Sequence, residues 1–473
     1  MDMERTLITN VHLAYEDATS GKTALGRQCL NGRVLDIVPS GNFQREPPVV
    51  TAGCPTVIQG NGGTLLPSLC HAHIHLDKCF IMEQCDPLLT GSLSEALQVM
   101  NKAKARFPDQ LADLHARATR LVRESVEAGV TEMRAFVEID TTVGMVCLDT
   151  GLKVKSEWKG VCDIQIVALR RKHCIHQPQP RTAGDNFELL RTALARDGIS
   201  VVGSAPWVEP SKEHAHKNII HILKLAQDYG LHADFHLDYN LDINVEPMVW
   251  ETLRQMRRIG WTKIGAGNRR VTIGHATRLG MFSAEEWSRL RVELDELPLG
   301  IVALPQSDIY MMSRPSSDGT PTVPFAERTL DVARIWRDHG IHVALSVNNV
   351  ENAFTPHGYL DPLTLTCLEV GLFRAGTEPG WRELLRSVSI TPKEVIGLMK
   401  DDGRPDGYAA DGLLPFIGGP ADFVMIHEAR RWQSAVLSPS FDRTTVVGGR
   451  VAARRTGSSW TILDGMESRQ GNK

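Results

Sequence analysis

Apolar strands alternate with amphipathic helices from residue 64 to about residue 400, and this alternation limits the possible folds more than any other feature. Helical patterns such as those at 111–128, 215–229 and 283–295 separate eight short apolar segments that are typical of buried strands. The expected strands are 64–70, 130–138, 161–169, 199–204, 232–237, 271–275, 299–305 and 342–347. Eight such units favour a closed (β/α)8 barrel, an α/β TIM barrel, over an open sheet.

The two ends of the chain have a different pattern. Residues 1 to about 63 form short strand-like runs broken by turns, and strand and turn patterns return after residue 400. We therefore expect a small β-rich composite domain built from residues 1–66 and 401–473, beside a barrel of residues 67–400.

Composition excludes two classes of partner. Hydrophobic residues make up 42% of the chain and charged residues 23%, which is ordinary for a globular protein, and the net charge is -4. No basic stretch could follow a phosphate backbone, so we expect no nucleic-acid partner. No run approaches the ~20 apolar residues that a membrane span needs, so we expect no membrane contact.

Cysteine usage and the first residues predict the compartment. The nine cysteines contain no CxxC pair, and an odd number in so long a chain is typical of reduced thiols. The opening MDMERTLITNVHL is acidic and lacks an apolar core, so it is not expected to be a signal peptide. These features predict a cytoplasmic protein.

The stretch SLCHAHIHLDKCF, residues 68–80, places His71, His73 and His75 at every second position. On a regular strand their rings would share one face, because side chains alternate across the pleat. Residues two apart on a strand are about 6.6 Å apart and residues four apart about 13 Å, so three such rings cannot all bind one ion. We expect His73 and His75, nearest the strand exit, to bind, and His71 to lie deeper as a packing or supporting group.

Other polar side chains end the later strands of the predicted barrel. His236 ends strand five, His275 ends strand six, and Asn348 and Asn349 end strand eight. Functional groups of TIM barrels lie at the C-terminal ends of the strands, and imidazole is a common ligand of divalent transition ions. A single histidine is usually structural, but this set predicts one site for a divalent ion, with zinc, iron, manganese and cobalt equally suitable.

Six motifs resemble, in order, the cytosine-deaminase-like branch of the amidohydrolase superfamily. They are HIHLDK (73–78), QIVAL (165–169), VVG (201–203), HLD (236–238), GHATRLG (274–280) and NNVENAFTPHG (348–358). The resemblance covers the whole chain and implies a divalent ion that activates water for attack on an sp² carbon. It also implies that His73, His75 and His236 are metal ligands and that His275 lies near the water.

The chain departs from this branch at positions that carry protons. Asn348 replaces an aspartate that is both ligand and proton acceptor, and a neutral amide can coordinate an ion but cannot take a proton as a carboxylate does. Tyr239 replaces a glutamate that protonates the substrate ring in the deaminases, and Arg170 and Arg171 lie near the position of a base-reading glutamine. His275 is then the best remaining proton acceptor.

These features are most similar to phenylurea hydrolases and to molinate hydrolase, which cleaves a thiocarbamate. We therefore expect an enzyme that hydrolyses a small urea, carbamate or thiocarbamate, such as an N,N-dialkyl phenylurea, with Asn348 as the fourth metal ligand. Expected substrate-binding residues are Tyr239, Arg171, Phe80 and Phe354. The resemblance also implies a homo-oligomer. Two alternatives remain open: a cytosine or aminotriazine deaminase, and an inactive barrel that serves as a binding protein.

Overall fold

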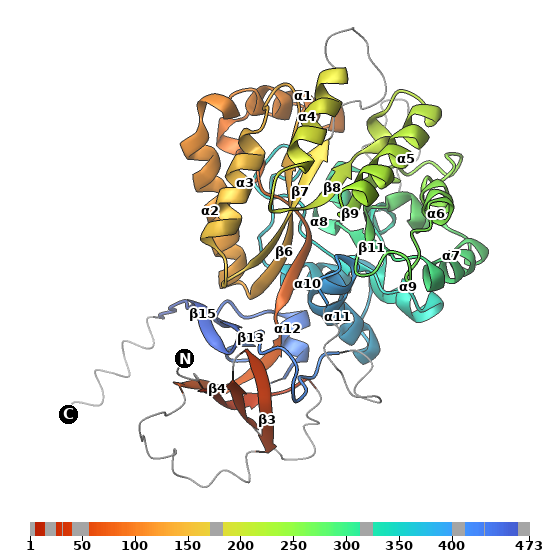
Figure 1. Cartoon of the computed structure of the whole chain (residues 1–473). Coiled ribbons are helices and arrows are strands. Elements are labelled where there is room, and N and C mark those ends of the chain that lie inside the picture. The colour runs from red at the N-terminus through yellow and green to blue at the C-terminus, as the bar shows by residue number, and fades with distance from the viewer. Residues whose placement is uncertain are drawn as a thin grey trace, which may run out of the picture.

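Two β-sheets organise the computed structural model (Figure 1). It describes residues 5–14, 25–30, 32–39, 56–170, 183–312, 325–399, 412–429 and 431–461. One sheet has eight strands and is surrounded by helices, and the other has seven strands and lies below it in Figure 1.

Parallel strands β5 to β12 form the eight-stranded sheet in sequential order, so the predicted (β/α)8 barrel is confirmed. The strands are β5 (Leu69–His75), β6 (Val130–Glu138), β7 (Asp163–Arg170), β8 (Ile199–Ser204), β9 (His232–Leu237), β10 (Val271–His275), β11 (Leu299–Ala303) and β12 (Ala344–Leu345). Strands β5, β10, β11 and β12 are buried throughout, and each of the other four has a single residue that is not buried. A parallel sheet is covered on both faces.

The barrel is nearly closed by hydrogen bonds between β5 and the residues that follow β12. The Asn348 amide donates to the carbonyl of His73 (3.1 Å), and the His75 amide donates to the carbonyl of Asn348 (2.9 Å). The Ser346 hydroxyl also donates to the His73 carbonyl (2.7 Å). The first and last strands are therefore joined at the histidine-bearing strand.

The first barrel strand differs from the prediction. Residues 64–67 end β4 (Thr56–Pro67) of the smaller sheet, and β5 begins only at Leu69. The expected strand at 64–70 thus joined the end of one strand to the start of the next, because both are apolar and only Pro67 and Ser68 mark the boundary between them. As a result, His71, His73 and His75 all lie on the strand itself.

Both ends of the chain contribute to the seven-stranded sheet, in the order β15-β14-β13-β4-β1-β2-β3. Besides β4, its strands are β1 (Arg5–His12), β2 (Leu25–Leu30), β3 (Arg33–Pro39), β13 (Phe423–Ile426), β14 (Arg443–Val447) and β15 (Arg450–Arg455). The central strand β4 pairs with β1 from the N-terminal part and with β13 from the C-terminal part. Arg443 of β14 donates to the carbonyl of Ala128 (2.7 Å), which fastens this sheet to the barrel.

Helices surround the barrel and fill its longer loops (Figure 1). They are α1 (Leu93–Lys104), α2 (Leu111–Glu127), α3 (Val146–Glu157), α4 (Ala183–Leu194), α5 (Lys212–Asp228), α6 (Val249–Arg258), α7 (Ala284–Glu296), α8 (Pro305–Met311), α9 (Val332–His339), α10 (Pro362–Phe373), α11 (Glu378–Val395) and α12 (Gln433–Leu437). Local sequence sets several boundaries: Ser283 and Glu286 form a capping box at the start of α7, and Gly340 ends α9 with a positive φ of 65°.

The barrel interior is layered beneath the strand exits. In a lower polar layer, Arg134 donates to Asp234 (2.8 Å), Thr272 (2.8 Å) and Gln165 (2.9 Å), and the Arg134–Asp234 ion pair is completely buried. An apolar layer of Phe136, Val167, Leu169 and Val201 lies above it. These packed layers, which are typical of TIM barrels, give the residues at the strand exits a rigid base.

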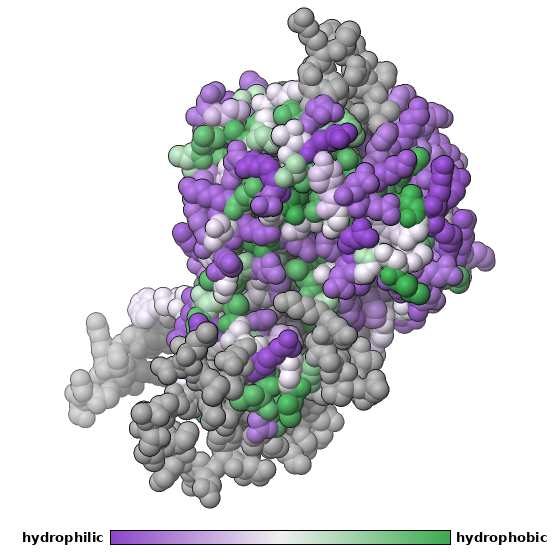
Figure 2. Space-filling model, in the orientation of Figure 1, coloured by the Kyte–Doolittle hydropathy of each residue, from purple (hydrophilic) through white to green (hydrophobic). Residues whose placement is uncertain are grey.

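The outside of the barrel is polar over most of the face seen in Figure 2. In the part of the chain that the structure describes, no helix is both long enough and apolar enough to span a bilayer. Six of the nine cysteines are described with their side chains, and none of these six forms a disulfide.

Candidate metal centre

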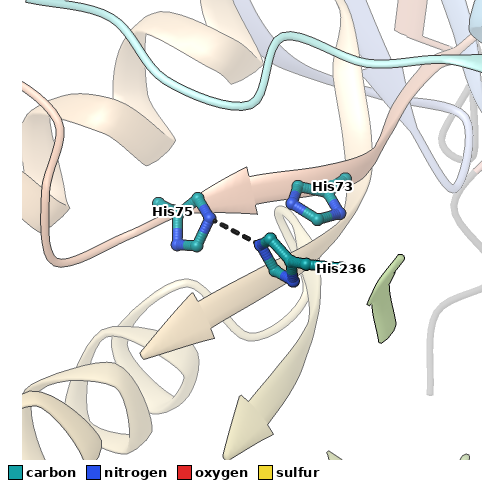
Figure 3. Close-up of side chains that lie close together, drawn as sticks. All are labelled: His73, His75 and His236. Atoms are coloured by element: carbon teal, nitrogen blue, oxygen red, sulfur yellow. Dashed lines mark hydrogen bonds between the residues drawn. The ribbon is translucent and has the colours of Figure 1, made fainter. Parts of the chain in front are cut away.

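Three histidines from opposite sides of the barrel lie close together (Figure 3). His73 and His75 come from β5 and His236 from β9, and one ring nitrogen of each lies within 4.8 Å of the others. The Nε2 atoms of His75 and His236 are 3.1 Å apart. The ring of Phe136 lies beneath all three, with centroid distances of 4.1 to 5.2 Å. The structure thus brings together the three histidines that the sequence predicted as ligands.

His71 does not join this group, although the strand pattern predicted that its ring would share their face. The pairing of β5 with β6 shifts register between His71 and Ile74, so a bulge interrupts the alternation of side chains. The fully buried His71 ring instead lies 3.3 Å from the hydroxyl of Ser125 on α2, and burial lowers its pKa to about 4. His71 is therefore a neutral packing residue between the barrel and α2.

The protonation and surroundings of His73 fit a metal ligand. Burial is the main cause that lowers the pKa of His73 well below its usual value, so the ring is neutral, as a ligand must be. Neither ring nitrogen of His73 has a hydrogen-bond partner among the described residues. A buried polar group without a partner is costly, and a divalent ion would satisfy it. The three imidazoles suit zinc, iron, cobalt or manganese.

Gly274 provides the space that the His73 ring occupies. A Cβ atom at position 274 would lie 2.7 Å from Nδ1 and 2.8 Å from Cε1 of His73. We predict that Gly274→Ala displaces this ring and weakens metal binding by about 10- to 100-fold, the range seen when groups supporting a ligand are disturbed. Competition with a chromogenic chelator measures this change.

Gly280→Ala is the matched control, because a Cβ there would meet nothing closer than 3.6 Å. Its metal affinity should equal that of the wild type. Equal affinities for Gly274→Ala and the wild type would contradict the placement of His73 in the metal group.

Asn348 lies beside the histidines and has an unusual backbone conformation. Its φ is 68°, in the left-handed region, which asparagine tolerates better than most residues. Its backbone bonds to His73 and His75 fix its position, and its buried Oδ1 has no hydrogen-bond partner among the described residues. An amide oxygen is therefore available next to the ligand strand.

His275 ends β10 and also adopts a left-handed conformation, with φ of 70°. Its ring centroid lies 5.5 Å from that of His236 and 6.0 Å from that of His73. Its Nδ1 is 2.7 Å from Oδ1 of Asp308, a fully buried residue of α8, and burial raises the pKa of this carboxyl above its usual value.

Sequence reasoning missed Asp308. Attention to strand ends could not find it, because it lies on the helix that follows β11 and reaches His275 from there. The available signal was its place shortly after a barrel strand, where functional residues collect.

Two aromatic side chains lie next to His275 in a row of ring contacts. The Tyr239 ring, predicted to contact substrate, lies 3.9 Å from that of His275 between centroids, and the Trp207 ring lies 5.9 Å from that of Tyr239. The sequence did not single out Trp207, whose indole N–H is buried without a hydrogen-bond partner among the described residues.

The other three predicted substrate residues stay predictions. Phe80 has a φ of 60°, and the guanidinium of Arg120 on α2 lies 3.7 Å from its ring centroid. Phe354 is buried in the main hydrophobic core. Arg171 lies outside the described residues, while its neighbour Arg170 ends β7 and is completely buried.

Two further carboxylates near the strand exits serve the backbone. Asp77 accepts a hydrogen bond from the Glu138 amide (2.8 Å), and Asp238 accepts from the amides of Met248 (2.7 Å) and Val249 (3.0 Å) at the start of α6. They fix the loops that follow β5 and β9, the strands that carry the three histidines. Asp308, by contrast, contacts the side chain of His275.

A large cavity of about 890 Å³ lies elsewhere, between the barrel and the small sheet. Its lining includes Thr131 and Asp163, at the N-terminal ends of β6 and β7, and Phe423 of β13. It therefore lies at the opposite end of the barrel strands from the histidines.

No protein-family model matches this sequence, and no curated protein matches it. Solved structures do resemble it. The 5-methylcytosine deaminase of Klebsiella pneumoniae, liganded with 5-fluorocytosine, has a TM-score of 0.78 and 20% identity, covering 97% of this chain and 100% of that one.

Two other solved structures cover nearly the whole chain. N-isopropylammelide isopropylaminohydrolase from Burkholderia multivorans has a TM-score of 0.70 and 22% identity, covering 96% of this chain and 99% of that one. Atrazine chlorohydrolase from Arthrobacter aurescens, complexed with zinc, has a TM-score of 0.61 and 16% identity, covering 98% of this chain and 99% of that one. The likeness shows that this chain shares the fold of these three proteins from end to end.

Proposed function

We propose that this protein is a metal-dependent hydrolase of the amidohydrolase type, acting on an sp² carbon of a small molecule. The observation that carries the proposal is the convergence of His73, His75 and His236 at the C-terminal ends of barrel strands. The likeness to a chlorohydrolase complexed with zinc, to an aminohydrolase and to a deaminase supports it.

A divalent ion bound by these histidines would act as a Lewis acid and lower the pKa of a water molecule. His73, His75 and His236 would hold the ion, with the Asn348 amide oxygen as the fourth donor. Because Asn348 is neutral, it cannot accept the water proton. We assign that step to His275, which receives the proton on its ring and returns it to the leaving group.

Tyr239 would orient the substrate. The Tyr239 ring packs against the ring of His275, the proposed proton acceptor. This packing helps to position the Tyr239 hydroxyl. We propose that this hydroxyl donates a hydrogen bond to the substrate or to the developing oxyanion.

Ureas, carbamates and thiocarbamates are our first candidate substrates. They need a good nucleophile but no protonation of a ring nitrogen, and the ligand group that the structure describes contains three imidazoles and no carboxylate. Tyr239 occupies the position where the resembling deaminases have a ring-protonating glutamate. The closer similarity to phenylurea and molinate hydrolases stays a prediction.

Deamination of a pyrimidine or an aminotriazine is the second candidate. The likeness to 5-methylcytosine deaminase, which extends over 97% of this chain, favours it at least as strongly as the first. In that case a group other than Tyr239 must supply the proton for the ring.

A substrate panel tests the proposal and separates the two candidates. Protein loaded separately with zinc, iron(II), manganese or cobalt is incubated with phenylureas, S-alkyl thiocarbamates, cytosines and aminotriazines. We expect release of the alkyl- or arylamine or thiol from the first two groups, with kcat/KM of at least about 10⁴ M⁻¹s⁻¹ for a good substrate.

The other outcomes are equally informative. Ammonia release from the last two groups alone would replace the first candidate by the second. A fully loaded protein that is inactive on all four groups would contradict both and favour a binding protein.

A further inference from the structure

We propose that Asp308 is a positioning residue that holds His275 in the tautomer with its proton on Nδ1, so that Nε2 is left to accept the proton. This inference rests on the proposed function, in which His275 takes the proton of water. It assigns a role to a carboxylate that no strand-end pattern predicted.

The contact between the two side chains defines their roles as donor and acceptor. His275 Nδ1 lies 2.7 Å from Asp308 Oδ1, a length typical of a charge-assisted hydrogen bond. An ionised carboxylate only accepts, so Nδ1 must donate. In a neutral imidazole the other nitrogen is then the acceptor.

The second oxygen of Asp308 is fixed by its own partners. Oδ2 accepts hydrogen bonds from the Leu304 amide (3.2 Å) and from the Thr329 hydroxyl (3.3 Å). Donors on this oxygen favour the ionised carboxylate and prevent it from rotating away from His275. Asp308 is completely buried, so water does not compete for either oxygen.

The neighbouring strand-exit carboxylates cannot play this role. Asp77 and Asp238 are bonded to backbone amides and hold loops. Since Asn348 brings no charge, Asp308 places a negative charge next to the proton acceptor without using a ligand position. A carboxylate therefore still takes part in the proposed proton transfer, but it contacts His275 and not the metal ion.

Nuclear magnetic resonance of the zinc-loaded full-length chain, with ¹⁵N-labelled histidine, tests the tautomer without any substrate. The His275 signals are assigned by their loss in His275→Gln. We expect a protonated Nδ1 and an unprotonated Nε2 in the wild type. A His275 that is protonated on Nε2 alone would overturn the proposal.

Asp308→Asn extends the test, because its amide can donate to Nδ1 and should shift the proton to Nε2. With a substrate from the panel, kcat should fall by roughly 10²- to 10⁴-fold, as expected for loss of a general base, while KM and the bound metal stay unchanged. Asp308→Glu, which retains the charge, should recover part of kcat. An unchanged tautomer, or a change confined to KM, would contradict the proposal.

Asp331→Asn is the matched control. Asp331 caps α9 by accepting from the Arg334 amide (3.0 Å), and asparagine caps helices equally well, so its tautomer and kcat should match the wild type. If the tautomer is as expected and no substrate is turned over, the proposed function fails and the positioning role of Asp308 stands.

Discussion

His236→Ala should bind no divalent ion tightly and should lose roughly 10³-fold or more of the hydrolytic rate, because a catalytic metal supplies several kcal/mol of transition-state stabilisation. His236 is the proposed ligand from the opposite side of the barrel, and its Nε2 lies 3.1 Å from that of His75. Without it, His73 and His75 offer two nitrogens on one strand. Elemental analysis after gel filtration, on protein purified with added zinc, measures the loss.

His71→Asn is the control for this experiment. His71 lies on the same strand as two of the ligands, but its ring contacts Ser125 of α2. This variant should retain one ion per chain, even if its stability falls. In the wild type, added metal should raise Tm, since an ion that binds the folded state stabilises it by mass action, and His236→Ala should show no such shift. A metal-replete His236→Ala protein would contradict the ligand assignment.

Asn348→Asp should strengthen metal binding and lower turnover of the preferred substrate by about tenfold. Aspartate tolerates the left-handed backbone of this position as asparagine does, so the fold should be retained. A carboxylate would bind the ion more tightly but would partly neutralise its charge. The pKa of the activated water would then rise, and a change of about one pKa unit corresponds to tenfold in population. Metal affinity and the kcat of the variant measure the two effects.

Asn349→Asp is a matched control next to it in the chain. The Asn349 Oδ1 accepts a hydrogen bond from Asn352 (2.8 Å), and a carboxylate can accept it as well. This variant should leave metal affinity and kcat unchanged. If Asn348→Asp instead raises hydrolysis a hundredfold, the site is better described as a decayed enzyme than as one adapted to a neutral ligand.

The strands of the barrel were largely predictable because they are apolar and bounded by polar turns. Expected strands at 130–138, 199–204, 232–237 and 271–275 coincide with β6, β8, β9 and β10. The first strand was misplaced, because apolar residues continue from β4 of the small sheet into β5 around Ser68. A pattern of hydrophobicity alone carries no information on which sheet a strand joins.

The sequence predicted the site residues that lie at strand ends. It did not predict the features that depend on local backbone irregularities or on helices. The convergence of His73, His75 and His236 follows from strand order alone. The register shift in β5 places the His71 ring against Ser125 of α2, and the residue pattern did not predict this irregularity. Asp308 was missed for a related reason, since it approaches from a helix.

X-ray absorption spectroscopy of the zinc-loaded protein examines the metal centre itself. The histidine convergence predicts a first shell with three imidazole nitrogens at about 2.0–2.1 Å, completed by oxygen donors. A shell with one imidazole or none, or a protein that retains no zinc after reconstitution, would contradict the proposed metal centre and the hydrolase function that depends on it.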